Sequence, residues 1–127
     1  MEKLIQSIAL AELVFKAMNQ RDFTDVEPYI HEDIIFDFPG LERVEGAKRV
    51  LVFLKALLRK YRFLTFTMQE YIEDKDQDKV CVVWSNEGED NSGMAYSSRG
   101  VTIIHLKDGK IKLISDYFKE PSFTKQN

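Results

Sequence analysis

Two segments of the chain repeat apolar residues at the spacing of an amphipathic helix. The first covers residues 3–20, and its apolar stripe consists of Leu4, Ile8, Ala11, Val14, Phe15 and Met18. The second covers residues 45–61, with Phe53 at the flank of its apolar stripe. Between them, Thr24 can cap a short helix that runs through Ile30. The pattern therefore predicts three helices, all early in the chain.

From residue 63 onward apolar and polar residues alternate, which is typical of strands. After an earlier strand at residues 33–38, strands are expected at residues 63–72, 80–86, 95–107 and 110–118. The charged segments 74–79 and 87–93 are interpreted as loops, and Asp108-Gly109 as a tight hairpin turn. The order ααβαββββ indicates an α+β fold in which helices pack on one face of an antiparallel sheet.

The last hairpin can be paired residue by residue. If Asp108-Gly109 is a two-residue turn, Val101 pairs with Asp116. Asp116 then shares a face with the apolar residues Val101, Ile103, Ile114 and Phe118, and the opposite face carries Thr102, Ile104, Leu113 and Tyr117. Because both faces hold aliphatic residues, we expect one to meet the helices and the other a second copy of the chain. The alternative is that these are ordinary exposed aliphatic residues.

Length and charge narrow the class of protein. The chain has 127 residues, enough for one domain, assigned to residues 1–121 with a loose tail at residues 122–127. Its formal net charge is −3, which argues against a general nucleic-acid binder. A single cysteine excludes an internal disulfide, and no metal-ligand spacing is present. No apolar run could span a membrane, and no signal peptide is evident, so a cytoplasmic location is expected.

Four short motifs resemble the nuclear-transport-factor-2-like superfamily in their order and spacing. They are Asn-Gln-Arg-Asp-Phe at residues 19–23, the segment at residues 29–36, Glu45-Gly46, and Asp-Gly-Lys-Ile at residues 108–111. Within that superfamily the chain is most similar to SnoaL-like polyketide cyclases and ketosteroid isomerase-like proteins. The resemblance implies a cone of curved antiparallel sheet around three helices, a homodimer formed through the sheet, and a mostly apolar ligand pocket. It does not settle function, because the superfamily includes enzymes, carriers and scaffolding domains.

Asp116 is the first candidate for a catalytic residue. An acid among large apolar residues is unusual in a plain core, because burying an unpaired charge is costly. The resemblance supports it, since SnoaL-like cyclases carry an aspartate five residues after the isoleucine that matches Ile111. A carboxylate in an apolar cavity has a raised pKa and can take a proton from a carbon next to a carbonyl group. The alternative is an aspartate paired with Arg99 at the rim of the sheet.

Asp37 is the second candidate. By resemblance it lies beside the position of the isomerases' proton-shuttling aspartate, which falls on Phe38 when counted without gaps from Asn19. A bulge or a one-residue shift would be needed to turn Asp37 inward. The alternative is a solvated aspartate that supports the Pro39-Gly40 turn.

Other positions depart from the isomerase pattern. Val14 occupies the position of the isomerases' oxyanion tyrosine, and residues 101–103 lack their second acid. Since a lost oxyanion donor often costs about 3 kcal/mol of barrier, a steroid-type isomerase is disfavoured. Trp84 or Tyr96 could donate instead.

The pocket of such a protein would be lined by aromatic residues and a methionine, although ordinary core is an alternative for each. The candidates are Phe15, Met18, Phe38, Phe53, Trp84, Tyr96 and Phe118. The sequence thus favours an enzyme that uses no cofactor and moves a proton at carbon in a small hydrophobic carbonyl compound, by cyclisation, isomerisation or dehydration. The alternative is a dimer that binds a hydrophobic ligand without catalysis, or an interaction domain.

Overall fold

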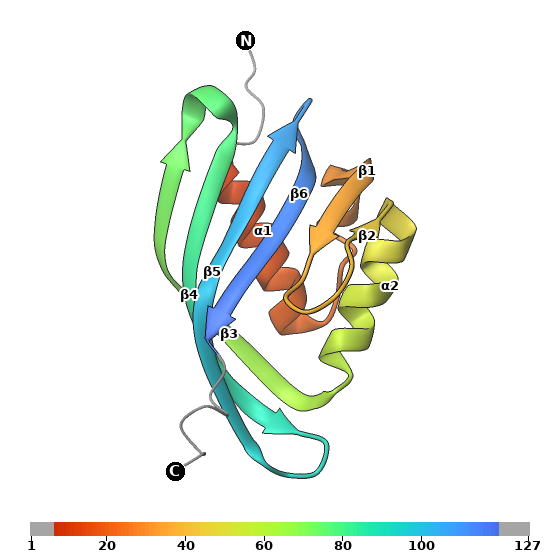
Figure 1. Ribbon diagram of the computed structural model, residues 1–127, viewed down its shortest axis with the longest axis vertical. Coiled ribbons are helices and arrows are strands. Elements are labelled where there is room, and N and C mark those ends of the chain that lie inside the picture. The colour runs from red at the N-terminus through yellow and green to blue at the C-terminus, as the bar shows by residue number, and fades with distance from the viewer. Residues whose placement is uncertain (1–6, 120–127) are drawn as a thin grey trace.

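The computed structural model describes residues 7–119, which form two α-helices and a six-stranded sheet (Figure 1). The helices are α1 (Ser7–Gln20) and α2 (Ala47–Leu58), and two single 3₁₀ turns are η1 (Glu27–Tyr29) and η2 (Lys75–Gln77). The strands are β1 (Ile30–Asp37), β2 (Val44–Glu45), β3 (Tyr61–Asp74), β4 (Lys79–Asp90), β5 (Ala95–Lys107) and β6 (Lys110–Lys119). The α+β class agrees with the prediction. The start of the first expected helix and the expected tail lie outside the described residues.

The helix count within residues 7–119 differs from the three helices expected. The segment after Thr24 forms only the 3₁₀ turn η1, which contains Pro28 near its start. Ile30, expected as the end of that helix, is already extended and begins β1. A proline is tolerated in a first turn because its missing N–H has no partner there, but this segment has no second turn.

The sheet is mixed and has the order β2-β1-β6-β5-β4-β3. β3 to β6 are antiparallel neighbours, as predicted, whereas β1 pairs with β6 in the parallel sense. The purely antiparallel sheet expected from the sequence is therefore corrected at this edge. β1 and β6 are the first and last strands in the sequence, so their pairing is a contact between distant parts of the chain. The sequence of either strand alone does not indicate such a contact, which is why the parallel pair was not predicted.

β5 has the predicted bounds, whereas β1, β3, β4 and β6 are longer than predicted. The acidic residues Glu87, Glu89 and Asp90, expected in a loop, belong to β4 and pair with β3. β3 itself is 14 residues long and contains two register shifts, one at its start and one in its middle. Extra residues of this kind bend a strand and increase its twist, so the long strands curve around the helices as Figure 1 shows.

The start of α2 explains the Glu45-Gly46 motif. Gly46 has a φ of 99°, in the region that favours glycine, and its N–H donates to the carbonyl of Ile34 at 2.8 Å. The glycine thus turns the chain from β2 into α2 while holding it against β1. The helix ends at Leu58, so Lys60, expected within it, lies in the turn that follows, and Tyr61, also expected within it, begins β3.

The end of α1 is fastened to the sheet by Asn19. Its Nδ2 donates to the carbonyl of Phe66 at 3.0 Å, and its Oδ1 accepts from the N–H of the same residue at 2.8 Å. Three residues later, Asp22 accepts hydrogen bonds from the N–H and hydroxyl of Thr24. These contacts give the motif at residues 19–23 a structural role.

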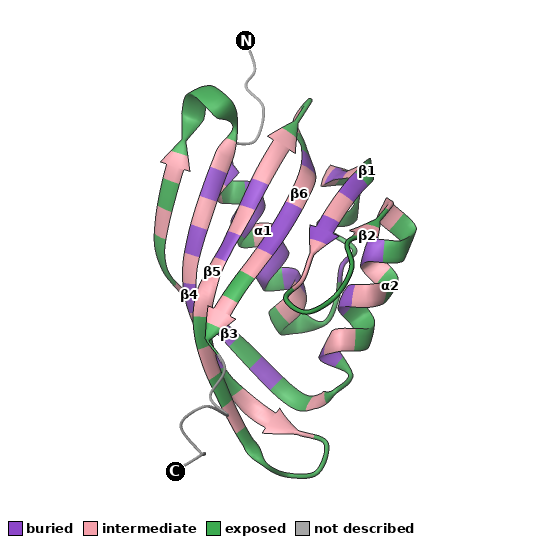
Figure 2. Ribbon diagram, viewed as in Figure 1, coloured by how far each residue is buried: buried purple, intermediate pink, exposed green. Residues whose placement is uncertain are grey.

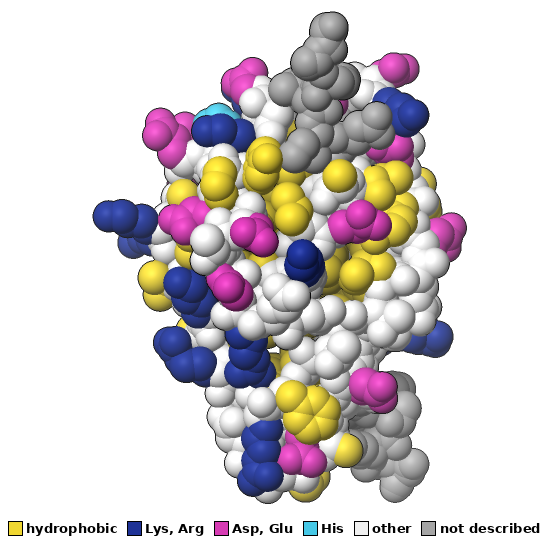
Figure 3. Space-filling model, turned by 180° about the vertical axis from the view of Figure 1, so that it is seen from behind, with side chains coloured by type: hydrophobic (Ala, Val, Ile, Leu, Met, Phe, Trp, Pro, Cys, Tyr) yellow, Lys and Arg dark blue, Asp and Glu magenta, His cyan; other side chains and the backbone are white. Residues whose placement is uncertain are grey.

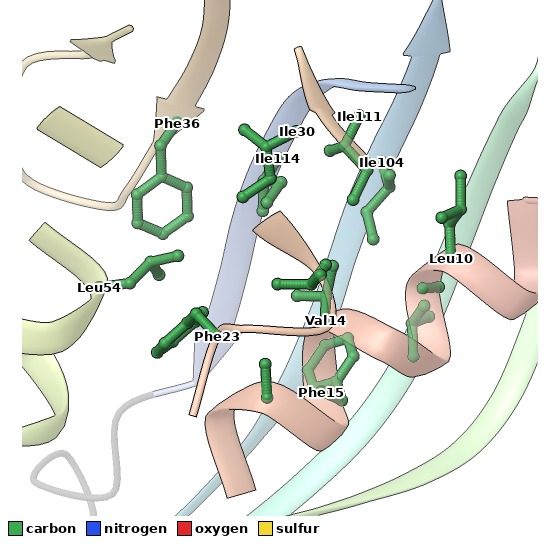
Figure 4. Packing of buried hydrophobic residues seen from close by; sticks show 14 of the residues in the cluster. Leu10, Val14, Phe15, Phe23, Ile30, Phe36, Leu54, Ile104, Ile111 and Ile114 are labelled. Carbon is green, nitrogen blue, oxygen red and sulfur yellow. The ribbon is translucent and has the colours of Figure 1, made fainter. Parts of the chain in front are cut away.

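The core lies between the helices and the inner face of the sheet. Buried side chains from α1, α2 and the strands point toward one another there (Figure 4). Along β4, buried residues alternate with partly buried ones, as the colours of Figure 2 show. This alternation is that of a strand whose inner face is covered more fully than its outer face. From the helix side, charged side chains of both signs are interspersed among apolar ones (Figure 3). No helix within residues 7–119 is long and apolar enough to cross a bilayer.

Candidate active site

A β-bulge in the last hairpin decides which side chains of β6 face the helices. The turn at Asp108-Gly109 forms as predicted, with both residues at positive φ. Two residues into β6 the register shifts, so that Lys112 is an extra residue without a partner on β5. Beyond the bulge Asp116 pairs with Thr102, and not with Val101 as expected.

The grouping of side chains expected from regular pairing is therefore wrong. Asp116 and Phe118 share the inner face with Thr102, while Val101 and Ile103 lie on the outer face. One inserted residue reverses the alternation of every residue after it, which is why counting from the turn gave Asp116 the wrong neighbours. Asp116 nevertheless faces inward, as expected, because it lines a cavity together with apolar residues.

Between the helices and the inner face of the sheet lies a cavity of about 220 Å³. An apolar cavity of about 150 Å³ is large enough for benzene, so this cavity has room for a larger molecule than one aromatic ring. Its lining is mostly aromatic and aliphatic and comes from both helices and from five of the six strands or their ends. Six residues singled out from the sequence line it: Phe15, Met18, Phe38, Trp84, Tyr96 and Phe118.

Phe53, the seventh, does not line this cavity. Its ring packs against Phe36 and Phe38, with centroid distances of 5.5 and 5.9 Å. Because Phe36 and Phe38 both line the cavity, Phe53 supports the wall from behind. In the sequence, Phe53 lies at the flank of the apolar stripe of its helix, which is consistent with a position behind the cavity wall.

Asp116 projects into the cavity from the middle of β6. It is half-buried and lies among Phe38, Trp84 and Phe118, which line the same space. Burial raises the pKa of its carboxyl group to about 6, against a smaller lowering by a hydrogen bond from Thr102, and the charge of Asp37 adds to the rise in pKa. Arg99 forms no ion pair with Asp116 in the described part of the chain.

Asp116 is the end of a short chain of hydrogen bonds. Trp84 Nε1 donates to Thr102 Oγ1 at 2.8 Å, and the Thr102 hydroxyl donates to Asp116 Oδ1 at 2.7 Å. The indole N–H can only donate and the ionised carboxylate can only accept, so the hydroxyl accepts from Trp84 and donates its own hydrogen to Asp116. One carboxyl oxygen is thus held in place, and the other is left for a molecule in the cavity. Trp84, considered as an oxyanion donor, is occupied by Thr102.

Gly100 makes room for the aromatic rings beside Asp116. It lies between Trp84 on β4 and Phe118 on β6 in the same row of the sheet. A Cβ atom built on Gly100 would lie 2.5 Å from Phe118 Cβ and would also collide with the carbonyl oxygen of Tyr117. The absence of a side chain therefore lets β5 and β6 approach closely, with the Trp84 and Phe118 rings 6.2 Å apart.

Asp37 lies on the opposite face of the sheet from the cavity. It pairs with Ser115 on β6, accepts a hydrogen bond from the Ser115 hydroxyl at 3.3 Å, and lies 4.0 Å from Arg43. No bulge turns it inward, and Phe38 lines the cavity in its place. The two aspartates do not meet in one site, and Asp37 acts on Asp116 through its charge.

The polar lining residues Lys60, Asn86, Ser98 and Thr102 were not among the candidates from the sequence. Thr102 falls in an aliphatic run, and the predicted register had turned it away from Asp116. Asn86 is 8% exposed and its Oδ1 accepts from the N–H and the hydroxyl of Ser98, both at 2.9 Å. An asparagine that ends a β-branched and aromatic strand is the one signal that could have found it.

The arrangement suits acid–base chemistry on an apolar molecule. A single carboxyl group with a pKa of about 6 lies in a mostly apolar wall and can accept or return a proton. Within the described residues, no group of three or more His, Cys, Asp or Glu side chains is arranged to hold a metal ion.

Comparison with known proteins agrees with this fold. The family model for the SnoaL-like domain matches residues 11–114. The match covers most of α1, all of α2 and most of the sheet, and it ends two residues before Asp116. No curated protein matches the sequence.

Several solved structures share the architecture at low sequence identity. A protein from Jannaschia sp. CCS1 classed as a SnoaL-like polyketide cyclase has a TM-score of 0.82 and 16% identity over 94% of this chain and 91% of that one. TerC, co-crystallised with polyporic acid, has a TM-score of 0.79 and 21% identity over 94% and 95%. An LEH-like epoxide hydrolase from Mycobacterium tuberculosis has a TM-score of 0.76 and 18% identity over 93% and 86%. At such identities the likeness establishes the fold alone.

Proposed function

This chain belongs to the SnoaL-like domain family, and we propose that it is a cofactor-independent enzyme that transfers a proton at a carbon atom of a small hydrophobic carbonyl compound. The reaction would be a cyclisation, an isomerisation or a dehydration. Structures of similar fold include one classed as a polyketide cyclase and one called an epoxide hydrolase, which is compatible with small-molecule chemistry in this fold.

One observation carries the proposal, namely the setting of Asp116. Its carboxyl group lies in an apolar cavity, is held by Thr102 through one oxygen, and has a pKa raised to about 6 by burial. Free aspartate is too weak a base to remove a proton from carbon efficiently, and a pKa nearer neutrality improves the match. A structural core gains nothing from such a group, because burying it costs free energy.

The proposed step follows from this geometry. Near neutral pH Asp116 is mostly ionised, and its free oxygen removes a proton from the carbon next to the carbonyl group of the substrate. The electron pair of the broken C–H bond moves into the carbonyl group and forms an enolate. The neutral Asp116 then returns the proton to another atom of the same molecule. Thr102 keeps the carboxyl group in one orientation throughout.

A second candidate function is the binding of a hydrophobic ligand without catalysis. It is favoured because no free hydrogen-bond donor of the described lining lies near Asp116. An enolate needs a hydrogen-bond donor at its oxygen. Thr102 already donates to Asp116, and Trp84 donates to Thr102. The other donors of the lining, such as Asn86 and Ser98, lie further along the sheet. A protein that binds a hydrophobic ligand without turning it over would need no such donor.

Hydrogen–deuterium exchange at carbon separates the two functions without knowledge of the natural substrate. Fused-ring methyl ketones such as 2-acetylnaphthalene would be incubated with the protein in D₂O, and the loss of the α-proton signal followed by NMR. We expect exchange above the background rate, with an apparent rate constant that rises with pH through about 6 as Asp116 ionises. Asp116→Asn should lower it about 100-fold or more.

Asp37→Asn is the matched comparison, because it makes the same chemical change on the outer face of the sheet. It should keep most of the exchange activity. Binding of the ketone without protein-dependent exchange, in wild type and in both variants, would replace the enzyme by the ligand-binding protein.

A further inference from the structure

We propose that Asn86 is a second polar contact for the substrate, at the opposite end of the cavity from Asp116, and that the substrate therefore carries a hydrogen-bond acceptor oxygen at the end remote from its reacting carbon. This inference rests on the proposed function and specifies the class of substrate. Neither the family match nor the likeness in fold assigns a role to Asn86.

The orientation of the Asn86 side chain follows from its partners. Its Oδ1 accepts from the backbone N–H of Ser98 at 2.9 Å and from the Ser98 hydroxyl at the same distance. A backbone N–H can only donate, so the atom that faces it must be the amide oxygen and not the nitrogen. The two contacts fix the amide group and direct Nδ2 away from Ser98.

Nδ2 is a donor that faces the cavity. Within residues 7–119 it makes no hydrogen bond, and each fully buried side-chain nitrogen or oxygen atom there has a partner. Nδ2 must therefore reach accessible space. Because Asn86 is only 8% exposed and lines the cavity, that space is the cavity. A buried amide that offers two hydrogens to an apolar cavity is costly unless an acceptor arrives there.

The sheet places Asn86 far from Asp116. Asn86 pairs with Ser98, which precedes Thr102 by four residues on β5, a backbone length of roughly 13 Å. β6 pairs with β5 only as far as Arg99, so Asn86 and Ser98 lie beyond the last paired residue of β6. Figure 1 shows β4 and β5 continuing past the end of β6.

Aromatic side chains fill the wall between the two polar ends. Trp84 and Phe118 lie next to Asp116, with ring centroids 6.2 Å apart, and Phe66 contacts Trp84 at 5.1 Å. Tyr61 and Tyr96, 5.0 Å apart, line the far end beside Asn86. A ligand that matches this sequence of groups is a flat, fused-ring ketone with an oxygen acceptor at its far end.

A pair of probes of equal shape tests the inference. 6-Methoxy-2-acetylnaphthalene carries an acceptor oxygen opposite its ketone, and 6-ethyl-2-acetylnaphthalene has a methylene group in its place. Binding would be followed by quenching of the single tryptophan of the chain, Trp84, which lines the cavity. We expect the ratio of the two dissociation constants to shift against the methoxy probe by about 2- to 10-fold in Asn86→Leu relative to wild type.

Asn86→Asp supplies a variant that keeps both hydrogen bonds with Ser98. A carboxylate can still accept both hydrogen bonds from Ser98, but it presents an oxygen to the cavity where the amide presented a donor. This variant should disfavour the methoxy probe at least as strongly as Asn86→Leu. Ser85→Ala, on the same strand but the outer face, should leave the ratio at its wild-type value.

The outcomes keep this inference apart from the proposed function. Equal ratios in wild type, Asn86→Leu and Asn86→Asp would overturn the role of Asn86, even if both ketones exchange deuterium in an Asp116-dependent way. A ratio that depends on Asn86, with no exchange of either ketone, would support the second contact and contradict the enzyme. Failure of both probes to bind would overturn the inferred substrate class.

Discussion

The Thr102 hydroxyl serves two residues that differ in kind. It accepts the hydrogen of the Trp84 indole and gives its own hydrogen to Asp116. The first contact satisfies a buried donor, and the second stabilises the charged form of a buried acid. Thr102 therefore affects both the stability of the fold and the pKa of Asp116.

Replacing Thr102 by valine should change both properties. Thr102→Val keeps the shape but removes the hydroxyl, so the pKa of Asp116 should rise further above its present value of about 6, because a contact that lowers it is lost. NMR titration of the carboxyl carbon and the pH dependence of deuterium exchange would both show the midpoint at higher pH. The Trp84 indole would also lose its acceptor, at a cost of about 1–3 kcal/mol in the free energy of unfolding.

Thr102→Ser is the control for this substitution, because it keeps a hydroxyl at the same place. Its titration midpoint should stay near that of wild type. An unchanged midpoint in Thr102→Val would show that the hydrogen bond does not govern the acidity of Asp116.

The ionisation of Asp116 should make stability depend on pH. Burial raises the pKa of its carboxyl group from an ordinary 3.8 to about 6, so between these values the folded protein holds a proton that the unfolded chain releases. The contribution of Asp116 to stability is therefore full below pH 4 and falls as pH rises to about 6. Asp116→Asn cannot ionise and should exceed wild type by up to about 3 kcal/mol at pH 7.5.

Urea unfolding at pH 4 and pH 7.5 would measure this difference. At pH 4 the two proteins should be nearly equal, because both side chains are then neutral. A variant that is no more stable than wild type at pH 7.5 would indicate a carboxyl group with ready access to water.

At the scale of elements, the β5–β6 hairpin sets the geometry of the cavity through a bulge and a glycine. The bulge at Lys112 brings Asp116 opposite Thr102. Gly100 lets the two strands approach closely where Trp84 and Phe118 flank the acid. Both devices act on backbone position, since the bulge shifts the inward–outward alternation of β6 by one residue and the glycine removes a side chain from β5.

Gly100→Ala should therefore be destabilising although it adds one methyl group. The new Cβ atom would collide with the backbone of Tyr117 and with Phe118, neither of which is the flexible end of a side chain. We expect a loss of about 1–3 kcal/mol in urea unfolding, with weaker binding of the naphthyl ketones as the strands separate. Arg99→Ala, an exposed change on the same strand, should stay within about 0.5 kcal/mol of wild type.

The sequence predicted the strands of this hairpin but not their register. Alternation and the Asp108-Gly109 turn are local signals, and both were interpreted correctly. A bulge depends on how two strands fit together, so nothing in residues 110–118 alone marks Lys112 as the extra residue. For the same reason Thr102 and Asn86 were missed, since an isolated polar residue in a strand does not reveal which side chain lies opposite. Similarly, the sequence did not decide whether Asp37 or Phe38 faces the cavity, because this depends on which face of β1 points inward.

At the scale of the whole molecule, the outer face of the sheet carries an apolar area across three strands. Val83, Val101 and Tyr117 form one row, and Ile103 lies next to it on β5. Tyr117 is 54% exposed, and the other three are partly exposed. A continuous apolar area on a sheet is typical of a contact between copies of a chain. We therefore retain the expectation of a homodimer, now through this set of residues.

Ile103→Glu tests that interface. A charge in the middle of the apolar area should convert the dimer to a monomer in sedimentation equilibrium, because the burial of an unpaired carboxylate between two subunits is costly. Val52→Glu, at an exposed position of α2 remote from the outer face, should leave the mass unchanged. A wild-type protein that sediments as a monomer at all concentrations would refute the dimer.

The bulge at Lys112 also makes the site sensitive to a change in the gene that leaves composition almost untouched. Ile111 and Asp116 both face inward although they are five positions apart. In a regular strand, residues an odd number of positions apart face opposite sides, so the extra residue Lys112 is what allows both to face inward. An in-frame deletion of that single codon would preserve the turn, the hairpin and the aliphatic pattern of β5. The deletion would turn Asp116 to the outer face of the sheet. A homologous protein that lacks this one residue would therefore have no acid in its cavity, even with an aspartate at the matching position of its sequence.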